Sequence, residues 1–343
     1  MSRKRRKKKT SRSLARKLSL QIGCFLAAAA IVLAVAGSWF VHHPRRWIEA
    51  KTASLPAFVT APLVWMGEPA ADLADALGLT GHDAVYEYDI EAPSGKIAFA
   101  GYPKRTGDPA PHDITVIDRG EFAIGWSPSL RHPVWVAYHV PQEAAFNIDT
   151  RPGFTKDKSV KNSPPAMSYA RSGYDRGHMA PNHAIASRFG EKMQKSTFLM
   201  SNISPQTPSL NRGVWREIEH RIADYWTARW GEIWVVVGCI SEKDGERVSG
   251  TDIDVPRKFY QLVVAQEGME VRAFALLFEQ EVPFRAWPAK YLVTIDELEK
   301  LSGLDFLPEL PSFIQSPLES ELPSRLWPVR KLDAFRQLLS HFK

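Results

Sequence analysis

A stretch of 24 residues without a charged side chain, Leu18 to Val41, limits most strongly how this chain can be organised. At a rise of about 1.5 Å per residue, a helix of that length crosses the ~30 Å hydrocarbon layer of a bilayer. Ten Lys and Arg residues and no acid precede it, within residues 1–17. The sequence therefore predicts a basic cytoplasmic leader at 1–17, a transmembrane signal anchor at 18–41 and an exported remainder, periplasmic or extracellular.

A cleaved secretory signal is the alternative for this stretch, because Ala34, Val35 and Ala36 resemble the small-residue pattern at which such signals are cut. However, the cationic leader is long for a secretory signal. Trp39 and Phe40 would also lie at the far interface of a retained helix, where aromatic side chains are favoured. We expect a retained anchor, and hence a single-pass membrane protein with its N-terminus in the cytoplasm.

The basic leader also determines the overall charge of the chain. There are 44 Lys and Arg residues against 38 Asp and Glu residues, and the sequence pI is about 9.2. Without the ten cations of the leader, 34 basic residues face 38 acidic ones. The high pI is therefore no evidence for a nucleic-acid partner of the folded part, which would need a local basic patch.

The exported part has no pair of cysteines to form a disulfide. The chain has two cysteines, Cys24 in the uncharged stretch and Cys239 in an apolar run. Hydrophobic residues make up 44% of the 343 positions, enough to bury a large core, which excludes a disordered polymer. We expect this core and a metal to stabilise the fold.

Alternating and continuous apolar segments predict a sheet after the anchor. Residues 42–81 are rich in Pro and Ala and are predicted to form a stalk with a packing helix. From there on, apolar segments bounded by Gly and Pro predict strands. The strands are expected at 84–90, 95–102, 121–127, 133–140 and 232–240, and as a hairpin at 258–279 that turns at Glu267–Gly268. We expect an α+β fold with a central, mainly antiparallel sheet flanked by helices.

Two segments have the apolar spacing of helices. Residues 211–230 place one apolar stripe along a helix face, and Gly231 would end that helix. Residues 294–303 begin with the capping-box pair Thr294 and Glu297. The remaining segment, 312–343, is predicted to be a Pro-rich tail that ends in an amphipathic helix.

The stretch YDRGHMAPN, residues 174–182, contains groups suited to cutting a phosphodiester bond. That reaction needs a base near neutral pH and cations for the phosphorane and the departing oxygen. His178 and Arg176 supply a base and a cation. Asn211, at the predicted helix start, offers an oxygen to Mg²⁺, which needs only one or two protein oxygens. Glu219 lies too far along the helix to share the ion and is predicted to organise its waters.

Each of these residues also has an ordinary structural alternative. His178 could lie in a solvated turn, Arg176 in a surface ion pair, Asn211 at a helix N-cap, and Glu219 in a pair with a neighbouring arginine. A zinc site at His178 and His183 is not expected, because zinc takes about four ligands and no cysteine or third histidine stands at a suitable offset.

Three segments in order, SGYDRGHMAPN, TFLMSNISPQ and LNRGVWREIE, resemble the successive signatures of the DNA/RNA non-specific endonucleases. The similarity extends over about residues 83–311, and a nuclease domain is predicted at 82–311. The resemblance implies a ββα-metal fold, Mg²⁺ as cofactor with Mn²⁺ as a substitute, and DNA and RNA as partners. The triplet Asp118-Arg119-Gly120 repeats part of the first signature without its histidine and is predicted to be a hairpin turn.

The resemblance also implies roles for individual residues. It makes His178 the general base, Arg176 a phosphate-contacting cation and Asn211 the sole direct protein ligand of Mg²⁺. The further implied roles are Glu219 as a supporting acid, Asn202 as the residue that orients the base, Asp175 as structural support of the turn, and Arg151 as a second substrate-binding arginine. Many family members carry an acidic residue shortly after the first signature, where this chain has His183 and Ala184.

The sequence thus predicts a membrane-anchored, exported, Mg²⁺-dependent endonuclease that hydrolyses DNA and RNA without sequence specificity. No base-reading module is evident, so contacts to backbone phosphates are expected. Two alternatives belong to other classes: a catalytically inactive envelope protein that binds or takes up nucleic acid, and an envelope scaffold. The sequence leaves the oligomeric state open, with a homodimer among the alternatives.

Overall fold

The computed structural model describes residues 86–87, 95–268, 270–323 and 326–327, which all belong to one compact unit, His82–Asp333. The predicted leader, anchor and stalk lie outside the described residues, as does the predicted terminal helix. Among the residues that are described, none of the helices is both long and apolar enough to cross a bilayer.

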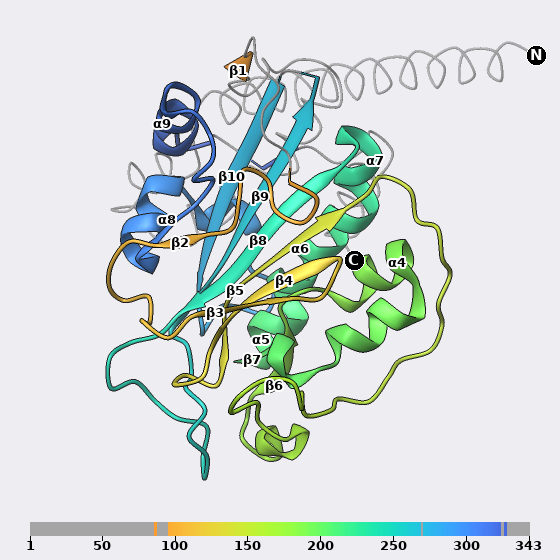
Figure 1. Cartoon of the computed structure of the whole chain (residues 1–343), viewed down its shortest axis with the longest axis vertical. Helices are drawn as coiled ribbons and strands as arrows, with labels where there is room; N and C mark the ends of the chain where they lie inside the picture. The colour runs from red at the N-terminus through yellow and green to blue at the C-terminus, as the bar shows by residue number, and fades with distance from the viewer. Residues whose placement is uncertain (1–85, 88–94, 269, 324–325, 328–343) are drawn as a thin grey trace, which may run out of the picture. The chain divides into compact units, whose positions relative to one another are not determined.

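An antiparallel sheet of eight strands lies at the centre of this unit (Figure 1). The strand order is β1-β10-β9-β8-β5-β4-β3, and β11 pairs with β10. The bounds are Tyr86–Glu87 (β1), Thr115–Asp118 (β3), Phe122–Ser127 (β4), His132–Val140 (β5), Ile233–Ile240 (β8), Lys258–Glu267 (β9), Glu270–Glu279 (β10) and Leu292–Val293 (β11). The predicted mainly antiparallel sheet is therefore confirmed.

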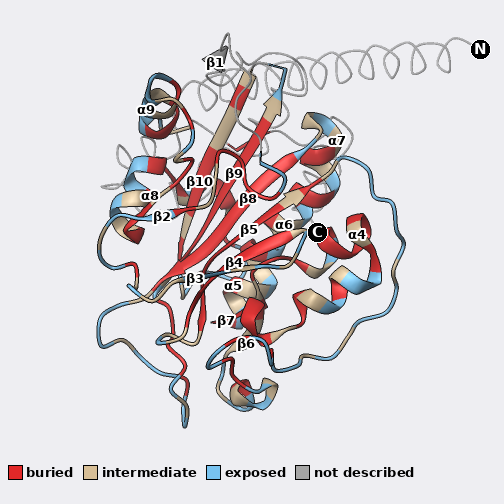
Figure 2. Cartoon of the chain, in the orientation of Figure 1, coloured by how far each residue is buried: buried red, intermediate tan, exposed pale blue. Residues whose placement is uncertain are grey.

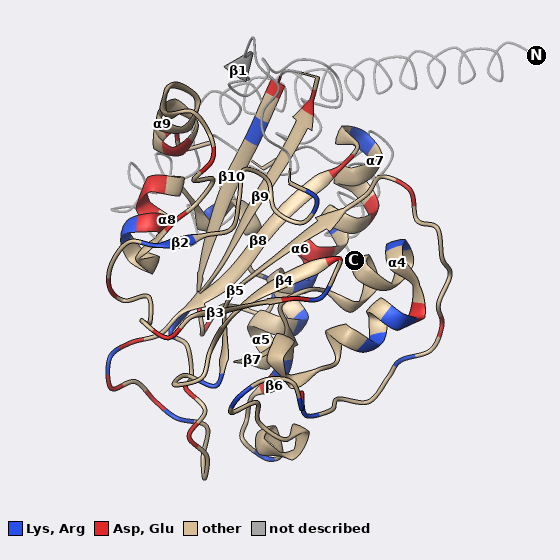
Figure 3. Cartoon of the chain, viewed as in Figure 1, with Lys and Arg blue, Asp and Glu red and all other residues tan. Residues whose placement is uncertain are grey.

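The central strands are buried on both faces. All eight residues of β8 are buried, and β8 pairs with β5 on one side and β9 on the other. Figure 2 shows the same burial along the middle of the sheet, and Figure 3 shows that β4, β5 and β8 carry no Lys, Arg, Asp or Glu. Successive side chains of a strand point to opposite faces, so a continuous apolar run requires a covering layer on each face.

One face is covered by the helical run 208–230 and by α4 (Asn182–Thr197). The helical run consists of α5 (Pro208–Leu210), η3 (Asn211–Trp215), α6 (Arg216–His220), η4 (Arg221–Trp226) and α7 (Thr227–Trp230), of which η3 and η4 are π-helical turns. Its apolar stripe, including Ile218, Ile222 and Trp226, packs in one core cluster with Val235 and Phe274 of the sheet. The stripe predicted from the 211–230 spacing is therefore the core-facing side.

Two further helices pack on the opposite face. They are α8 (Ile295–Ser302) and α9 (Ser312–Ser320), whose buried residues share a second core cluster with the other side chains of β8 and β9. The capping box predicted for α8 is partly present: Thr294 Oγ1 accepts a hydrogen bond from Glu297 N at 3.0 Å. Gly303, with φ 70°, ends the helix in the left-handed conformation.

The remaining short elements connect these layers. They are β2 (Lys104–Arg105) paired with β12 (Leu304–Asp305), the strand pair β6 (Asp175–His178) and β7 (Ile203–Gln206), α4 (Asn182–Thr197), and the single turns η1 (Ala166–Tyr169), η2 (Met200–Asn202) and η5 (Pro288–Tyr291).

Both predicted hairpin turns are present. Glu267 pairs with Glu270 across the turn that contains Gly268. In the Asp118-Arg119-Gly120 triplet, Arg119 N donates to Phe122 O at 2.9 Å and the turn joins β3 to β4. The Arg119 guanidinium pairs with buried Asp157, so this second Asp-Arg-Gly sequence has a structural role.

The strand predicted at 95–102 is wrong. Residues 97–100 are buried in the second core cluster, but the backbone is irregular and Ala100 has a positive φ of 51°. Burial produces the same apolar pattern in a strand and in an irregular buried segment, so periodicity could not distinguish these two structures. The helix α4 was not predicted. Polar residues interrupt the apolar spacing that identifies a helix face, and the chain kinks at Gly190 (φ 82°).

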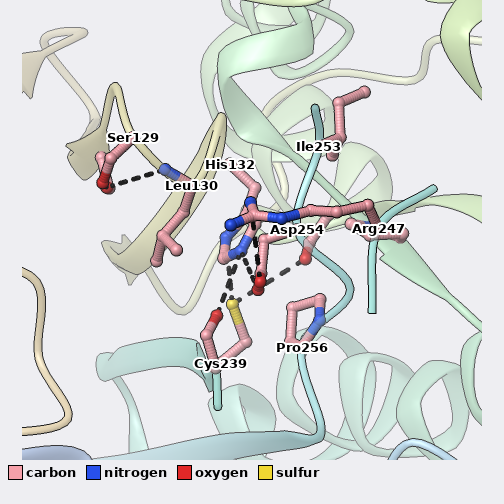
Figure 4. Close-up of polar contacts among 12 residues, drawn as sticks. Ser129, Leu130, His132, Cys239, Arg247, Ile253, Asp254 and Pro256 are labelled. Carbon is pink, nitrogen blue, oxygen red and sulfur yellow. Dashed lines mark hydrogen bonds and ion pairs between the residues drawn. The ribbon is translucent and has the colours of Figure 1, made fainter. Parts of the chain in front are cut away.

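A buried polar cluster fixes the long connection between β8 and β9 to the sheet (Figure 4). His132 Nε2 of β5 lies 3.3 Å from Asp254 Oδ2 of the connection, and both side chains are buried. Cys239 Sγ of β8 lies 3.4 Å from His132 Nδ1, and Asp254 N donates to Leu130 O at 3.0 Å. Burial opposes charge on the imidazole, but Cys239 and Asp254 outweigh it and raise the pKa of His132 to about 10. His132 is therefore an imidazolium at neutral pH, with Asp254 as its counter-ion.

We predict that Asp254→Asn removes a pH-dependent part of the stability. The pKa of His132 rises on folding from its ordinary value of about 6.5 to about 10. The pair therefore stabilises the fold fully below pH 6.5 and loses this effect as the pH rises toward 10. Urea unfolding should show a loss of about 3–5 kcal/mol for the variant at pH 6 and a smaller loss at pH 10. Asp252→Asn, in the same connection but exposed, is the control. An equal loss at both pH values would contradict this account.

Candidate active site

A strand-strand-helix unit brings the three sequence motifs together. In the β6–β7 pair, His178 lies opposite Ile203 and Asp175 lies opposite Gln206. The helical run 208–230 follows β7 after a single residue, Thr207, whose side chain caps it by accepting from Leu210 N. Asn211 is therefore inside the first turns of the helix and is not its N-cap.

A pocket of about 480 Å³ opens beside this unit. Six of the seven residues expected to form the site line it: Arg151, Asp175, Arg176, His178, Asn211 and Glu219. The pocket is also lined by Phe154, Pro181, Asn182, His183, Ala184, Arg212, Arg216 and His220. Residues that are up to 69 positions apart in the sequence (151 to 220) thus share one site.

The imidazole of His178 lies against two aromatic rings. Its ring centroid is 5.2 Å from that of Phe154 and 4.7 Å from that of Phe198. Burial, together with the nearby Arg151 cation, lowers the pKa of His178 to about 3. The imidazole is therefore neutral at physiological pH, which is the protonation state from which a general base acts.

The side chain of Asn202, predicted to orient the base, is hydrogen-bonded to backbone groups of Ala180 and Thr197 and not to this imidazole. Its side chain is fully buried outside the pocket. The carboxamide oxygen accepts from Ala180 N at 2.9 Å, and the carboxamide nitrogen donates to Ala180 O at 3.0 Å and to Thr197 O at 2.9 Å. Asn202 therefore fixes the backbone two residues after His178 and can position the base only through that segment.

The same aromatic pair supports two guanidinium groups. The Arg176 Cζ atom lies 5.3 Å from the Phe154 ring centroid, and its Nε donates to Ala166 O at 2.8 Å. The Arg151 Cζ atom lies 5.6 Å from the Phe198 ring centroid. Cation–π contacts of this kind hold a guanidinium without neutralising it. Both cations therefore remain available to an anionic ligand in the pocket.

Asp175 sets the orientation of Asn211. Its Oδ2 accepts from Asn211 Nδ2 at 2.9 Å and from Arg212 Nε at 2.7 Å, and its Oδ1 accepts from Arg212 Nη2 at 2.6 Å. Although burial opposes the charge, Arg212 and Asn211 lower the pKa of Asp175. With its nitrogen occupied, the carboxamide of Asn211 has its oxygen left for a ligand. Asp175 thus supports the site by joining β6 to the helix, and not only its own turn.

The helix backbone is also unusual at this position. Asn211 belongs to the π-helical turn η3, and Gly213 within that turn leaves helical geometry, with φ −97° and ψ −120°. A Cβ atom on Gly213 would lie 2.7 Å from Phe284 O, so a side chain there would collide with the backbone of another segment. Glycine at position 213 therefore allows the tightly packed, distorted turn in which Asn211 lies.

The oxygen donors of the pocket fit a hard divalent cation. Burial raises the pKa of Glu219 to about 8, and Trp215 Nε1 donates to its Oε1 at 3.0 Å. Asn182 Oδ1 is buried without a hydrogen-bond partner among the described residues. A nearby divalent cation would favour the ionised form of Glu219 and satisfy unpaired oxygens. Asn211 therefore offers the oxygen ligand suited to Mg²⁺, and Asn182 and Glu219 contribute further oxygens to the lining of the same pocket.

Several residues of the pocket were missed by reasoning from the sequence. They are Phe154, Asn182, Arg212, Arg216 and His220, together with Phe198 behind the imidazole. Asn182, Phe198 and Arg212 lie inside the three motif segments, and this position could have identified them as residues of the site. The role of Phe154 depends on tertiary packing, for which the sequence carries no local pattern.

The comparison with protein families agrees with this geometry. The family model described as DNA/RNA non-specific endonuclease matches residues 103–313, more than half of the chain. The chain belongs to this family.

The human (Homo sapiens) mitochondrial nuclease EXOG is 32% identical over 209 residues, which cover 55% of each chain. A nuclease of Nostoc sp. is 30% identical over 224 residues, covering 61% of this chain and 79% of the relative. A nuclease of Serratia marcescens is 29% identical over 223 residues, with 60% and 79% covered.

A solved structure shares the fold. The crystal structure of the EndoG/EndoGI complex aligns with a TM-score of 0.50 and 24% sequence identity, over 57% of this chain and 86% of that chain. At this identity the similarity shows the fold alone. The chain spans about half, 55%, of the length of the human EXOG nuclease.

We predict that Asp175→Asn weakens divalent-cation binding by about 10–100-fold, since it removes the charge that holds Asn211 and Arg212. Titration with Mn²⁺, followed by electron paramagnetic resonance, measures the change on the purified protein. The matched control is Asp118→Asn in the other Asp-Arg-Gly turn, where the carboxylate accepts from Gly120 N at 2.6 Å. Unchanged Mn²⁺ affinity in the Asp175 variant would show that Asn211 is held by other contacts.

Proposed function

We propose that this protein is a Mg²⁺-dependent endonuclease that hydrolyses phosphodiester bonds in DNA and RNA without sequence specificity, and that β6, β7 and the helical run are its ββα-metal unit. The observation that carries the proposal is the pocket itself. A neutral imidazole, several guanidinium groups and the unpaired Asn182 Oδ1 atom line one cavity. Membership of the DNA/RNA non-specific endonuclease family supports the same substrate class.

His178 is the general base in this proposal. A water molecule in the pocket would transfer a proton to the imidazole as the water oxygen attacks phosphorus. The aromatic walls of Phe154 and Phe198 exclude solvent from the ring and keep it neutral. Because the side chains of Phe154 and Phe198 also contact the guanidinium groups, the base and the phosphate-binding cations are positioned by the same two rings.

The phosphate is bound by arginines. Arg176 and Arg151 carry positive charge into the pocket, and Arg212 and Arg216 also line it. Guanidinium groups bind phosphate oxygens in pairs of hydrogen bonds and stabilise the extra negative charge of the transition state. Contacts to backbone phosphates carry no sequence information, which accounts for the absence of sequence specificity in the proposed activity.

The divalent cation would be held by Asn211, with Asn182 and Glu219 next to it. When bound, it supplies positive charge for the departing 3′ oxygen. Asp175 keeps the Asn211 carboxamide in a fixed orientation, and Trp215 does the same for Glu219. Products with 5′-phosphate ends are expected from the resemblance to the family.

We also propose that residues 18–41 anchor the enzyme in a membrane, with residues 1–17 in the cytoplasm and the catalytic part exported. The uncharged length of the stretch and its basic flank support this arrangement. Cell fractionation of the full chain tests it: full-length protein in washed membranes supports a retained anchor, and a shortened soluble protein contradicts it.

We predict that the purified full chain nicks supercoiled plasmid and degrades single-stranded RNA in the presence of Mg²⁺, and that EDTA abolishes both activities. His178→Ala should lower the rate by about 10²–10⁴-fold, the usual contribution of a general base. His112→Ala is the control, because that imidazole is exposed and lies far outside the pocket lining. Plasmid binding without cleavage by the wild type would favour the non-catalytic alternative, and full activity of His178→Ala would contradict the assigned base.

A further inference from the structure

A second group of metal-ligand side chains lies at the rim of the pocket. His183 Nε2 is 2.9 Å from Asp224 Oδ1, and His220 Nδ1 is 3.2 Å from Asp224 Oδ2. The three ligand atoms all lie within 4.8 Å of one another. The side chains of His183, His220 and Asp224 are 54%, 53% and 40% exposed, so an ion can reach them from solvent. We name these three residues the His–Asp cluster.

Two separate helices build the His–Asp cluster. His220 and Asp224 are four residues apart on the helical run, which places them on the same helix face. His183 comes from the first turn of α4, which packs against that helix. The two imidazole rings are 5.6 Å apart between centroids, and each has a ring nitrogen directed to a different oxygen of the same carboxylate.

The donor types favour a transition metal over Mg²⁺. In a tetrahedral zinc site with bonds of about 2.0–2.1 Å, neighbouring ligand atoms are about 3.3 Å apart by simple geometry. In the metal-free cluster the two nitrogen-to-oxygen distances, 2.9 and 3.2 Å, are hydrogen bonds, and the three ligand atoms lie within 4.8 Å of one another, close enough for one ion to replace those bonds. Imidazole nitrogens suit zinc and similar ions, whereas Mg²⁺ takes oxygen donors, which are found deeper in the pocket. This cluster differs from the pair of His178 and His183 considered in the sequence, because His183 meets two ligands from another helix, His220 and Asp224.

One neighbouring charge acts against cation binding. Arg188 of α4 is close enough to interact electrostatically with both His183 and Asp224. Its guanidinium is bonded, however, to Ala223 O at 2.5 Å and to Ser187 Oγ at 2.8 Å. These contacts fix the Arg188 cation on the helix backbone, so it does not occupy the position between the three ligand atoms.

We propose that His183, His220 and Asp224 form a second cation site that binds zinc or a similar transition-metal ion, separate from the oxygen site at Asn211. Three protein ligands leave one tetrahedral position for water or a phosphate oxygen. A bound ion would cross-link α4 to the helical run and would add positive charge where His183 and His220 line the pocket. This inference does not depend on the proposed endonuclease activity, because metal binding is measured directly.

Equilibrium dialysis of the metal-free full chain against micromolar Zn²⁺ tests the site, with millimolar Mg²⁺ present to compete at the oxygen donors. The wild type should retain one zinc per chain, measured by mass spectrometry. His220→Gln and Asp224→Asn should each lower the zinc affinity at least about tenfold, since each removes one of three ligands. His112→Ala, which changes another exposed histidine beside an aspartate, and Asn211→Ala should leave it unchanged.

Thermal unfolding gives a second readout. Zinc should raise the midpoint of the wild type by about 3–6 °C for each tenfold excess over its dissociation constant, and this shift should be absent in His220→Gln and Asp224→Asn. Each shift is measured from the same variant's midpoint without zinc, because Asp224 also pairs with both imidazoles in the metal-free protein. Wild-type protein that is folded but retains no zinc would overturn the proposal, as would equal zinc retention by the wild type and both variants.

Discussion

The antiparallel pairing of β6 with β7 is the contact on which the site depends. It sets His178 opposite Ile203 and Asp175 opposite Gln206, and a shift of one residue would turn both side chains to the other face. Gly177 allows this register, because a methyl group there would collide with the side chain of Gln206. From this fixed strand, Asp175 reaches Asn211 on the helix, so one short strand pair determines the positions of both the proposed base and the proposed metal ligand.

Burial then gives these side chains their chemistry. Burial lowers the pKa of His178 and raises the pKa of Glu219, so the same desolvation keeps both side chains uncharged, and a cation bound nearby would ionise Glu219. The scaffold around the pocket carries its own charges inside the core. The ion pair of His132 and Asp254 fixes the β8–β9 connection, whose apolar residues pack with Ile203 behind β7. The stability of the β8–β9 connection therefore affects the geometry of the β6–β7 strand pair.

Much of the fold could be predicted from the sequence because the patterns were local. The apolar run of β8, the hairpin turn at Gly268 and the stripe of the helical run each reflect burial over a few consecutive residues. Five of the six predicted residues that line the pocket lie within three ordered motifs: Asp175, Arg176, His178, Asn211 and Glu219. The true partners of Asn202, the aromatic support of His178 and the meeting of His183 with His220 could not be predicted. These contacts join segments that are distant in sequence and depend on how α4 packs.

The central claim is that Asn211 and His178 face one catalytic cation and one phosphate in a single pocket. The most direct test is a crystal structure of the His178→Ala variant with Mn²⁺ and a short DNA duplex, with the ion located by its anomalous scattering. The account predicts a Mn²⁺ peak in direct contact with Asn211 Oδ1, with a backbone phosphate between that ion and the position of residue 178. A pocket without Mn²⁺, or an ion whose protein ligands do not include Asn211, would contradict it.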